Sequence, residues 1–435
     1  MKIALVWPRS TFLEDPMVYP PLGLWYIWTA LEKDQHEVVY RDTSVDEYKT
    51  IPECDYYFVS GTSAQLLEIR KILKWLRKHR SGKIVLGGSH ALTQSEEHLS
   101  SLGFDLVYIG EINTKEDLEF VLNPDVKAKI IRVPFNKNLD DMLSPSRKAA
   151  WKYKAFLQDP GGKKHPTTSL FTSRGCPNKC AFCESGAGRM WGDKIRFNPL
   201  EIVLKELEEC YGLGFTGIMF YDDILPMNKN RTLKILDILK KYHEEIGAIW
   251  RCFLRTDILI QQGGYEYLKL MRKSGLMEIL VGVESASNKI KQNVKKGTTI
   301  EQDNQVLEWC KKLDIKFKAS LILGLPGETL ETMEKTREWI FERRPDRVDV
   351  GTFIPFPGTP ITTDMAISGN GYDIYLDMSH ADKKQGDTKL PETFWYKGPR
   401  DKSICLVGTS SLTPKQIGDF RNKLVKEIIK AGIPY

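Results

Sequence analysis

Hydrophobic and polar positions alternate in blocks along the first 120 residues of the chain. Short apolar runs begin near residues 2, 36, 56, 83 and 105, and longer amphipathic segments separate them. In one of these segments, apolar side chains recur with the 3.6-residue period of a helix, at residues 66, 67, 69, 72, 73 and 76. Residues 21–33 are expected to form a buried helix. Continuous apolar strands that alternate with helices are typical of a doubly wound parallel sheet.

The alternation resumes near Leu170 and predicts six further strands, each but the last followed by a helix. These strands are expected at residues 169–175, 216–223, 249–257, 278–285, 316–328 and 347–360. Such a (β/α)6 set is two units short of a complete eightfold barrel. The predicted α/β chain therefore has four parts: a Rossmann-like doubly wound sheet (1–123), a proline-rich linker (124–168), a partial barrel (169–365) and a C-terminal capping segment (366–435) that ends in a helix.

Composition narrows the classes of function. The 435 residues are 41% apolar and 28% charged, which is ordinary for a globular enzyme and excludes a disordered chain or a coiled coil. The 63 basic and 57 acidic residues nearly balance, so a nucleic-acid partner is not expected. No apolar run reaches the roughly 18 residues of a membrane span, and the first residues do not read as a signal peptide. We expect a cytoplasmic protein without membrane contact, whose cysteines stay reduced.

Three of the eight cysteines are crowded into RGCPNKCAFC, residues 174–183, with the spacing Cys-x3-Cys-x2-Cys. Reduced, clustered thiols indicate a metal site. A [4Fe–4S] cluster takes one thiolate for each anchored iron, so Cys176, Cys180 and Cys183 would leave one iron open for an outside ligand. Zinc is the alternative, but it would need Cys210 as a fourth ligand. The remaining cysteines stand singly and are interpreted as packing residues, at positions 54, 210, 252, 310 and 405.

Over most of residues 1–365 the chain resembles the radical S-adenosylmethionine (SAM) enzymes. The three-cysteine motif follows the first predicted barrel strand, and the aromatic Phe182 precedes its last cysteine. The stretches YDD, VGVESAS, KKGTT and ILGLPGET then follow in the family's order. The resemblance implies that SAM binds the open iron of a [4Fe–4S] cluster and is cleaved to a 5′-deoxyadenosyl radical. It also implies an electron donor such as a flavodoxin or ferredoxin.

The resemblance assigns SAM-binding roles by matching position. Glu284 would bind the ribose hydroxyls, and Lys296 would pair with the SAM carboxylate. Further contacts are implied for Arg255 and Ser320, for Gly324 and Leu325 at the adenine, and for Asp222 and Asp223 at the amino group. The two aspartates replace the Gly-Gly-Glu of many relatives. A helix cap or solvent contact for the aspartates, a rim ion pair for Glu284 and a surface position for Lys296 are the alternatives.

The N-terminal part resembles the cobalamin-binding domain that precedes the barrel in one large radical SAM subgroup, the class B methyltransferase-like enzymes. The matching stretches are residues 19–38, VSGTSAQ, VLGGSHAL and IGE. The resemblance implies a corrin ring that lies over the carboxyl ends of the strands and faces the barrel. Its contacts would come from Ser60, Thr62, Ser63, Gly87, Gly88, Gly110 and Glu111.

Two departures from that pattern concern cobalamin. The Asp-x-His-x-x-Gly motif, which supplies a histidine to cobalt in many cobalamin mutases, is absent. The usual Gly-Glu-Gly-Glu is replaced by GEIN at residues 110–113, a change that could weaken or abolish cobalamin binding. His90 stands beside a glycine turn and is interpreted as a hydrogen-bonding turn residue, with a cobalt ligand as the alternative.

The resemblance therefore predicts a cobalamin-dependent radical SAM C-methyltransferase that acts on a small molecule or peptide through a 5′-deoxyadenosyl radical and methylcobalamin. The alternatives are a cyclase, ring-contraction enzyme or epimerase without methyl transfer, and a non-catalytic iron–sulfur or cobalamin sensor. A methylthiotransferase would need a second cysteine-bound cluster, and the N-terminal half contains only Cys54. The substrate is expected to enter between the two domains, near the C-terminal tail. Aromatic side chains on connecting segments, at Tyr19 and in residues 189–194 and 392–398, are candidates to line its pocket, with core or interface packing as the alternative.

Overall fold

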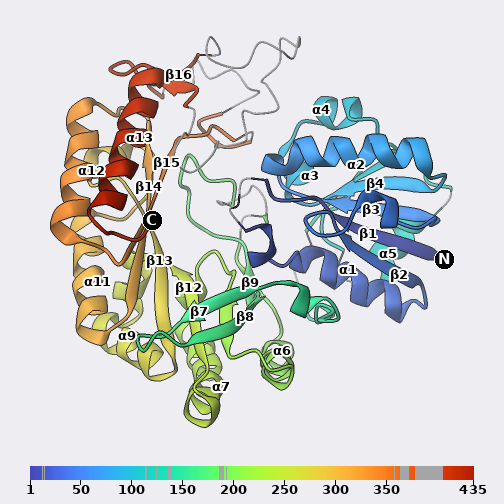
Figure 1. Ribbon diagram of the computed structural model, residues 1–435, viewed down its shortest axis with the longest axis horizontal. Helices are drawn as coiled ribbons and strands as arrows, with labels where there is room; N and C mark the ends of the chain where they lie inside the picture. The colour runs from blue at the N-terminus through green and yellow to red at the C-terminus, as the bar shows by residue number, and fades with distance from the viewer. Residues whose placement is uncertain are drawn as a thin grey trace.

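Two large sheets form the framework of the chain and lie beside each other in the molecule (Figure 1). The computed structural model describes residues 1–11, 13, 15–112, 115–123, 125–135, 139–185, 191–192, 194–356, 358–362, 372–377 and 405–435. The predicted fold class, a doubly wound parallel sheet followed by a partial barrel, is confirmed.

The N-terminal sheet has six strands, all parallel, in the order β2-β1-β3-β4-β5-β6. These strands are β1 (Lys2–Trp7), β2 (Glu37–Asp42), β3 (Tyr56–Ser60), β4 (Lys83–Gly87), β5 (Leu106–Ile109) and β6 (Ile130–Arg132). The order 2-1-3-4-5 places a topological switch point between β1 and β3. Doubly wound sheets bind ligands outside the carboxyl ends of the strands at such a point.

Helices cover both faces of this sheet because successive strand side chains point to opposite sides. The helices are α1 (Leu22–Lys33), α2 (Leu66–His79), α3 (Ser89–Thr93), α4 (Glu96–Ser101) and α5 (Lys115–Leu122). Ile3 and Leu5 pack into a core with α1 and α5, whereas Ala4 and Val6 pack with α2, α3 and α4. The one-residue alternation along β1 therefore builds two separate cores.

The second sheet has seven strands in the order β15-β14-β13-β12-β11-β8-β7 and curls into a half-barrel (Figure 1). Its strands are β7 (Ala155–Gln158), β8 (Lys164–Leu170), β11 (Gly217–Phe220), β12 (Ile249–Leu254), β13 (Leu276–Glu284), β14 (Lys316–Leu323) and β15 (Arg347–Thr352). All neighbours are parallel except β7, which pairs antiparallel with β8. All six predicted barrel strands are present.

Helices cover the outer face of the half-barrel, where Trp250, Phe317 and Val350 are buried beneath them. These helices are α6 (Leu200–Gly212), α7 (Lys229–Ile246), α8 (Thr256–Gln262), α9 (Gly264–Lys273), α10 (Asn288–Asn293), α11 (Ile300–Leu313), α12 (Leu330–Arg343) and the C-terminal α13 (Pro414–Lys430). Helix α13 packs against β15 and lies along the same outer wall (Figure 1). Two small ladders complete the strands: β9 (Ser173–Arg174) with β10 (Arg196–Phe197), and β16 (Tyr375–Leu376) with β17 (Val407–Gly408).

Residues 124–168, expected to be a linker, contain strands of both sheets. β6 joins the N-terminal sheet, β7 joins the half-barrel, and β8 starts at Lys164, five residues earlier than predicted. β6 and β7 are edge strands of three and four residues, too short for a hydrophobic period to be recognised in the sequence. Among the described helices, none is long and apolar enough to cross a membrane.

Candidate functional site

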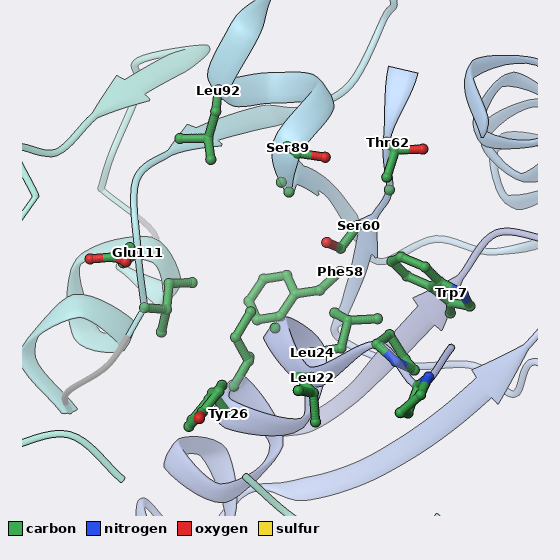
Figure 2. Close-up of a pocket in the computed structure, with 18 of the residues that line it drawn as sticks. Trp7, Leu22, Leu24, Tyr26, Phe58, Ser60, Thr62, Ser89, Leu92 and Glu111 are labelled. Atoms are coloured by element: carbon green, nitrogen blue, oxygen red, sulfur yellow. The ribbon is translucent and has the colours of Figure 1, made fainter. Parts of the chain in front are cut away.

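A cavity of about 520 Å³ lies between the two sheets. The front sheet lines it with the carboxyl ends of β1, β3 and β4 and with the start of α1, and the barrel lines it with residues that follow β8 and β11. Figure 2 shows Trp7, Phe58 and Tyr26 among the side chains that surround this space. The cavity therefore occupies the switch point of the front sheet and the carboxyl edge of the barrel, where both folds bind ligands.

Most of the residues predicted to contact cobalamin line this cavity. They are Ser60, Thr62, Gly87, Gly88, Gly110 and Glu111. Gly88 has φ +88°, and a Cβ atom there would lie 2.6 Å from Ser60 Oγ and 2.9 Å from the Gly61 amide nitrogen. Only glycine allows the loops after β3 and β4 to meet so closely, which leaves backbone exposed to a ligand at this edge.

Ser63 and His90 lie outside the cavity lining. Their side chains contact each other instead, with 3.1 Å between Ser63 Oγ and His90 Nδ1. His90 is fully buried, and this burial lowers its pKa to about 3, so the imidazole is neutral. The interpretation of His90 as a hydrogen-bonding residue fits this placement, and its position gives no support to a cobalt ligand.

The strand that leads into the three-cysteine motif is held by Asp222. This carboxylate is fully buried and accepts hydrogen bonds from the Thr172 amide at 2.9 Å, from Thr172 Oγ1 at 2.6 Å and from Ser173 Oγ at 2.5 Å. The neighbouring Asp223 lines the cavity, and burial raises its pKa to about 6. The sequence predicts one shared role for the two aspartates, but the structure gives them different positions. Asp222 anchors the strand, and Asp223 faces the cavity.

The three cysteines lie on one loop beyond this strand. Cys176 and Cys180 are buried and Cys183 is partly buried. Asn178 Nδ2 lies 3.3 Å from Cys176 Sγ, and Arg255 Nη1 lies 3.6 Å from Cys180 Sγ. Burial raises the pKa of the Cys183 thiol to about 12. Within the described ranges, no group of three His, Cys, Asp or Glu side chains is placed to hold a single metal ion. A [4Fe–4S] cluster does not need such a group, because each cysteine binds a different iron.

The donor set therefore fits an iron–sulfur cube: three thiols from one loop, with the Arg255 guanidinium beside one of them. A fourth ligand from Cys210 does not fit. α6 runs back from the carboxyl edge of the barrel, and Cys210 near its far end is fully buried in the barrel core. Burial raises the pKa of the Cys210 thiol to about 12.

Arg255, Glu284 and Lys296 converge beside the cysteine loop, although they are far apart in sequence. Arg255 Nη2 donates to the Lys296 carbonyl at 2.7 Å, and Lys296 Nζ lies 2.7 Å from Glu284 Oε1. Both members of this ion pair are buried. Glu284 has φ +63° where the register between β13 and β14 shifts, an unusual backbone for a side chain with a Cβ.

The remaining predicted SAM-site residues lie on β14 and its continuation. Ser320 pairs in register with Gly282, the residue over which the Glu284 and Lys296 side chains meet. The Gly324 amide donates to Glu328 Oε2 at 2.6 Å. Phe182 and Leu325 share a small apolar cluster behind the cysteine loop. Phe182, within the cysteine loop, thus packs in the same apolar cluster as Leu325.

Two arginines that pair with the cavity residue Glu111 were not predicted from the sequence. Glu111 Oε1 lies 2.7 Å from Arg174 Nη1, and Glu111 Oε2 lies 2.5 Å from Arg196 Nη1. Arg174 stands two residues before Cys176, which is a local signal that could have identified it. Arg196 has no such signal, because only the pairing of β10 with β9 brings it to Arg174.

Comparisons with protein families identify both halves. Residues 170–340 match the model of the radical SAM superfamily, and residues 11–118 match the model of the B12 binding domain. The chain is a radical SAM protein with a B12-binding domain. Both matches agree with the sheets described above. The implied cofactors are a [4Fe–4S] cluster and SAM for the barrel and cobalamin for the front sheet.

Curated relatives extend over most of this radical SAM protein. It is 27% identical to an uncharacterized methyltransferase of Pyrococcus horikoshii, covering 85% of this chain and 84% of that protein. It is 26% identical to the bacteriochlorophyllide d C-12(1)-methyltransferase of Chlorobaculum tepidum, covering 90% and 85%. An anaerobic magnesium-protoporphyrin IX monomethyl ester cyclase of Rubrivivax gelatinosus is 30% identical, over 53% of this chain and 40% of that protein.

A solved structure shares the fold. The radical SAM methyltransferase TsrM of Kitasatospora setae, solved with cobalamin and a [4Fe–4S] cluster, aligns with a TM-score of 0.67 and 16% identity. The alignment covers 91% of this chain and 81% of TsrM. The two-sheet arrangement is therefore common to both proteins.

Replacing Asp222 with asparagine is expected to destabilise the barrel by about 1–3 kcal/mol, because one of its two acceptor atoms becomes a donor that faces buried donors. Denaturant unfolding followed by tryptophan fluorescence measures the change. The matched control is Asp223→Asn, which changes the neighbouring carboxylate at the cavity and should shift the midpoint less. Equal midpoints for the two variants would contradict the anchoring role of Asp222.

Proposed function

We propose that this radical SAM protein is a cobalamin-dependent C-methyltransferase that acts on a small molecule or peptide. The observation that carries the proposal is the shared cavity, which the carboxyl edge of the front sheet and the carboxyl edge of the barrel line together. A group bound to either edge would face the group bound to the other. The names of two relatives that match over most of their length, both methyltransferases, support the same activity.

When bound, the [4Fe–4S] cluster would supply the electron that cleaves SAM, and cobalamin would carry the methyl group on its cobalt. The chain's own residues bind, orient and shield these groups. Cys176, Cys180 and Cys183 would each hold one iron. Arg255, 3.6 Å from Cys180 Sγ, would offset the negative charge of the thiolates.

SAM would be held by residues around the Glu284–Lys296 pair. Glu284 would accept hydrogen bonds from the ribose hydroxyls, and Lys296 would pair with the carboxylate. Ser320, on the adjacent strand, would contact the same ligand, and Gly324 would lie at the adenine. Asp223 is the better candidate for the amino group, because Asp222 already accepts three hydrogen bonds from the cysteine strand.

Cobalamin would lie over Ser60, Thr62, Gly87 and Gly88. One buried donor supports a polar ligand in the cavity: Trp7 Nε1 has no hydrogen-bond partner within the described part of the chain, and Trp7 lines the cavity. Buried donors of this kind are normally satisfied, so a ligand that accepts hydrogen bonds would complete them.

A cytoplasmic location is proposed because all eight cysteines are free thiols rather than disulfides. A flavodoxin or ferredoxin is proposed as the electron donor because the radical SAM resemblance implies one. The candidate substrate contacts at residues 392–398 and at residues 189, 190 and 193 lie outside the described residues. Tyr19 and Trp191 line the cavity and are the described candidates for substrate contact.

A radical cyclase or another enzyme without methyl transfer is the second candidate, because a cyclase is among the relatives. That match covers only half of this chain, so methyl transfer stays the first proposal. A methylthiotransferase is disfavoured, since Cys54 in the N-terminal half is buried and its pKa is raised by burial to about 11. A sensor would bind SAM or cobalamin without cleaving SAM.

The triple change of Cys176, Cys180 and Cys183 to alanine should abolish iron–sulfur absorbance after anaerobic reconstitution, because it removes all three thiolates. Iron and sulfide analysis with the visible spectrum measures the loss. Cys54→Ala is the control and should retain the full iron content. A triple variant that still binds about four irons would overturn the cluster assignment.

Glu284→Ala should weaken SAM binding about tenfold or more while the cluster stays intact, since hydrogen bonds to a charged group contribute about 1.5–3 kcal/mol. Anaerobic equilibrium dialysis with SAM and the oxidised cluster gives the affinity. Glu278→Ala on the same strand, which breaks the 3.0 Å contact to Arg251, is the matched control. An unchanged SAM affinity in Glu284→Ala would indicate that Glu284 forms only a structural ion pair at the barrel rim.

The deciding experiment reconstitutes the protein with iron, sulfide and hydroxocobalamin, removes unbound material, and adds SAM and a reductant. We expect retained cobalamin and both S-adenosylhomocysteine and 5′-deoxyadenosine by mass spectrometry. 5′-Deoxyadenosine alone, without retained cobalamin, would favour a cyclised or isomerised product. Binding of SAM or cobalamin without cleavage of SAM would favour a sensor.

A further inference from the structure

A buried cluster of three charged side chains connects the front sheet with the cysteine strand. Glu111 follows β5, Arg174 ends β9, and Arg196 begins the antiparallel partner β10. One carboxylate oxygen of Glu111 contacts both arginines, at 2.7 Å from Arg174 Nη1 and 3.0 Å from Arg196 Nη2. The other oxygen lies 2.5 Å from Arg196 Nη1. A single carboxylate from the front sheet thus pairs with two guanidinium groups from the β9–β10 ladder.

This cluster is mostly buried. The three residues are between 8% and 9% exposed, and aromatic rings cover the guanidinium groups. Arg174 lies 5.1 Å from the centre of the Tyr26 ring, and Arg196 lies 5.5 Å from that of Phe135. Burial alone would raise the pKa of Glu111, but the two arginines outweigh it and lower the pKa, so the carboxylate stays ionised. Charge-assisted hydrogen bonds between mostly buried groups hold a defined geometry, because a charge displaced from its partner is poorly compensated there.

The cluster lies one residue from the cysteine motif. Only Gly175 separates Arg174 from Cys176, and its φ of +92° makes the turn between them. A Cβ atom on Gly175 would lie 3.0 Å from the Lys194 carbonyl oxygen, so the turn is tightly packed. On the barrel side, Asp222 fixes the two residues before Arg174. The strand that delivers Cys176 is therefore held by one buried carboxylate from each sheet.

We propose that Glu111 is a positioning residue that fixes the cysteine loop relative to the front-sheet edge of the cavity. The identity of the two bound groups rests on the proposed function, whereas the mechanical link does not. If both groups bind as proposed, this link would fix the residues that hold the cluster relative to those that hold the cobalamin. It also gives a role to the glutamate that remains where the Gly-Glu-Gly-Glu pattern becomes GEIN: that glutamate joins the two sheets rather than contacting solvent.

Glu111→Gln tests the link in the cofactor-free protein. The amide keeps the shape but loses the charge and one acceptor atom, so the two buried arginines lose their shared partner. Hydrogen–deuterium exchange followed by mass spectrometry should show amides of residues 175–185 exchanging about tenfold faster or more, because local opening there becomes easier. Arg196→Gln removes one arginine and leaves the Arg174 contact, so it should give a smaller increase.

Glu206→Gln is the matched control. Glu206 is a fully buried carboxylate paired with Arg147, which binds the Ser169 carbonyl on β8. This variant should lower global stability but leave exchange at residues 175–185 at the wild-type rate. Equal exchange rates at residues 175–185 in Glu111→Gln and Glu206→Gln would contradict the positioning role, because Glu111 would then act as any other buried ion pair. If Glu111→Gln cannot be purified, the contrast between Arg196→Gln and Glu206→Gln decides.

A second readout uses the reconstituted protein. Pulsed electron paramagnetic resonance between the reduced cluster and cob(II)alamin should give a narrow distance distribution in wild type and a broader one in Glu111→Gln. An equally narrow distribution in both would overturn the positioning role. Failure of the wild type to retain cobalamin would count against the proposed function alone, since the exchange measurement would still decide the role of Glu111.

Discussion

Buried carboxylates hold the strand that delivers the first cysteine, and the rest of the site depends on this restraint. On the barrel side, Asp222 accepts hydrogen bonds from Thr172 and Ser173. On the front-sheet side, Glu111 pairs with Arg174. A thiolate that anchors a metal cluster must stand at a fixed point, yet loops are the most mobile parts of a fold. Fixing the residues just before the loop sets the point from which the loop, with its three cysteines, begins.

The restraint has this effect because the two sheets share one cavity. Parallel strands bring all their carboxyl-end loops to one edge, and here the edges of a doubly wound sheet and a half-barrel line the same space. The switch point between β1 and β3 supplies the front wall, and the residues after β8 and β11 supply the opposite wall. Small movements between the sheets would therefore change the distance between anything bound on the two sides.

Much of this could be predicted from the sequence, for physical reasons. The alternation of apolar and amphipathic blocks reflects burial on both faces of a parallel sheet, so β1 to β5 and the six parallel barrel strands were all expected. The edge strands β6 and β7 were missed because three or four residues with mixed polarity carry no period. The convergence of Arg255, Glu284 and Lys296 beside Cys180 follows from the resemblance and from the rule that parallel strands end at one edge.

The pairing partners could not be predicted in the same way. Glu111 was expected at the corrin edge, and the structure shows it lining the cavity while paired with two arginines. Ser63 was grouped with Ser60 and Thr62, yet the helical turn that begins at Ser63 directs its side chain to His90. Such contacts depend on which way one side chain points and on register between distant segments. The local period of apolar residues reveals that a strand exists, but it reveals neither the direction of one side chain nor the register between distant segments.

The buried Glu284–Lys296 ion pair has the charges that a zwitterionic ligand requires. Burial acts to lower the pKa of Lys296, and the carboxylate 2.7 Å away outweighs this, so the pKa is raised and the ammonium persists. Either residue alone would be an uncompensated charge beside the cysteine loop. The amino-acid part of SAM carries an ammonium and a carboxylate of its own. Such a zwitterion can exchange partners with a protein ion pair without leaving net charge buried, and the positive φ of Glu284 directs its carboxylate over Gly282, where that exchange would take place.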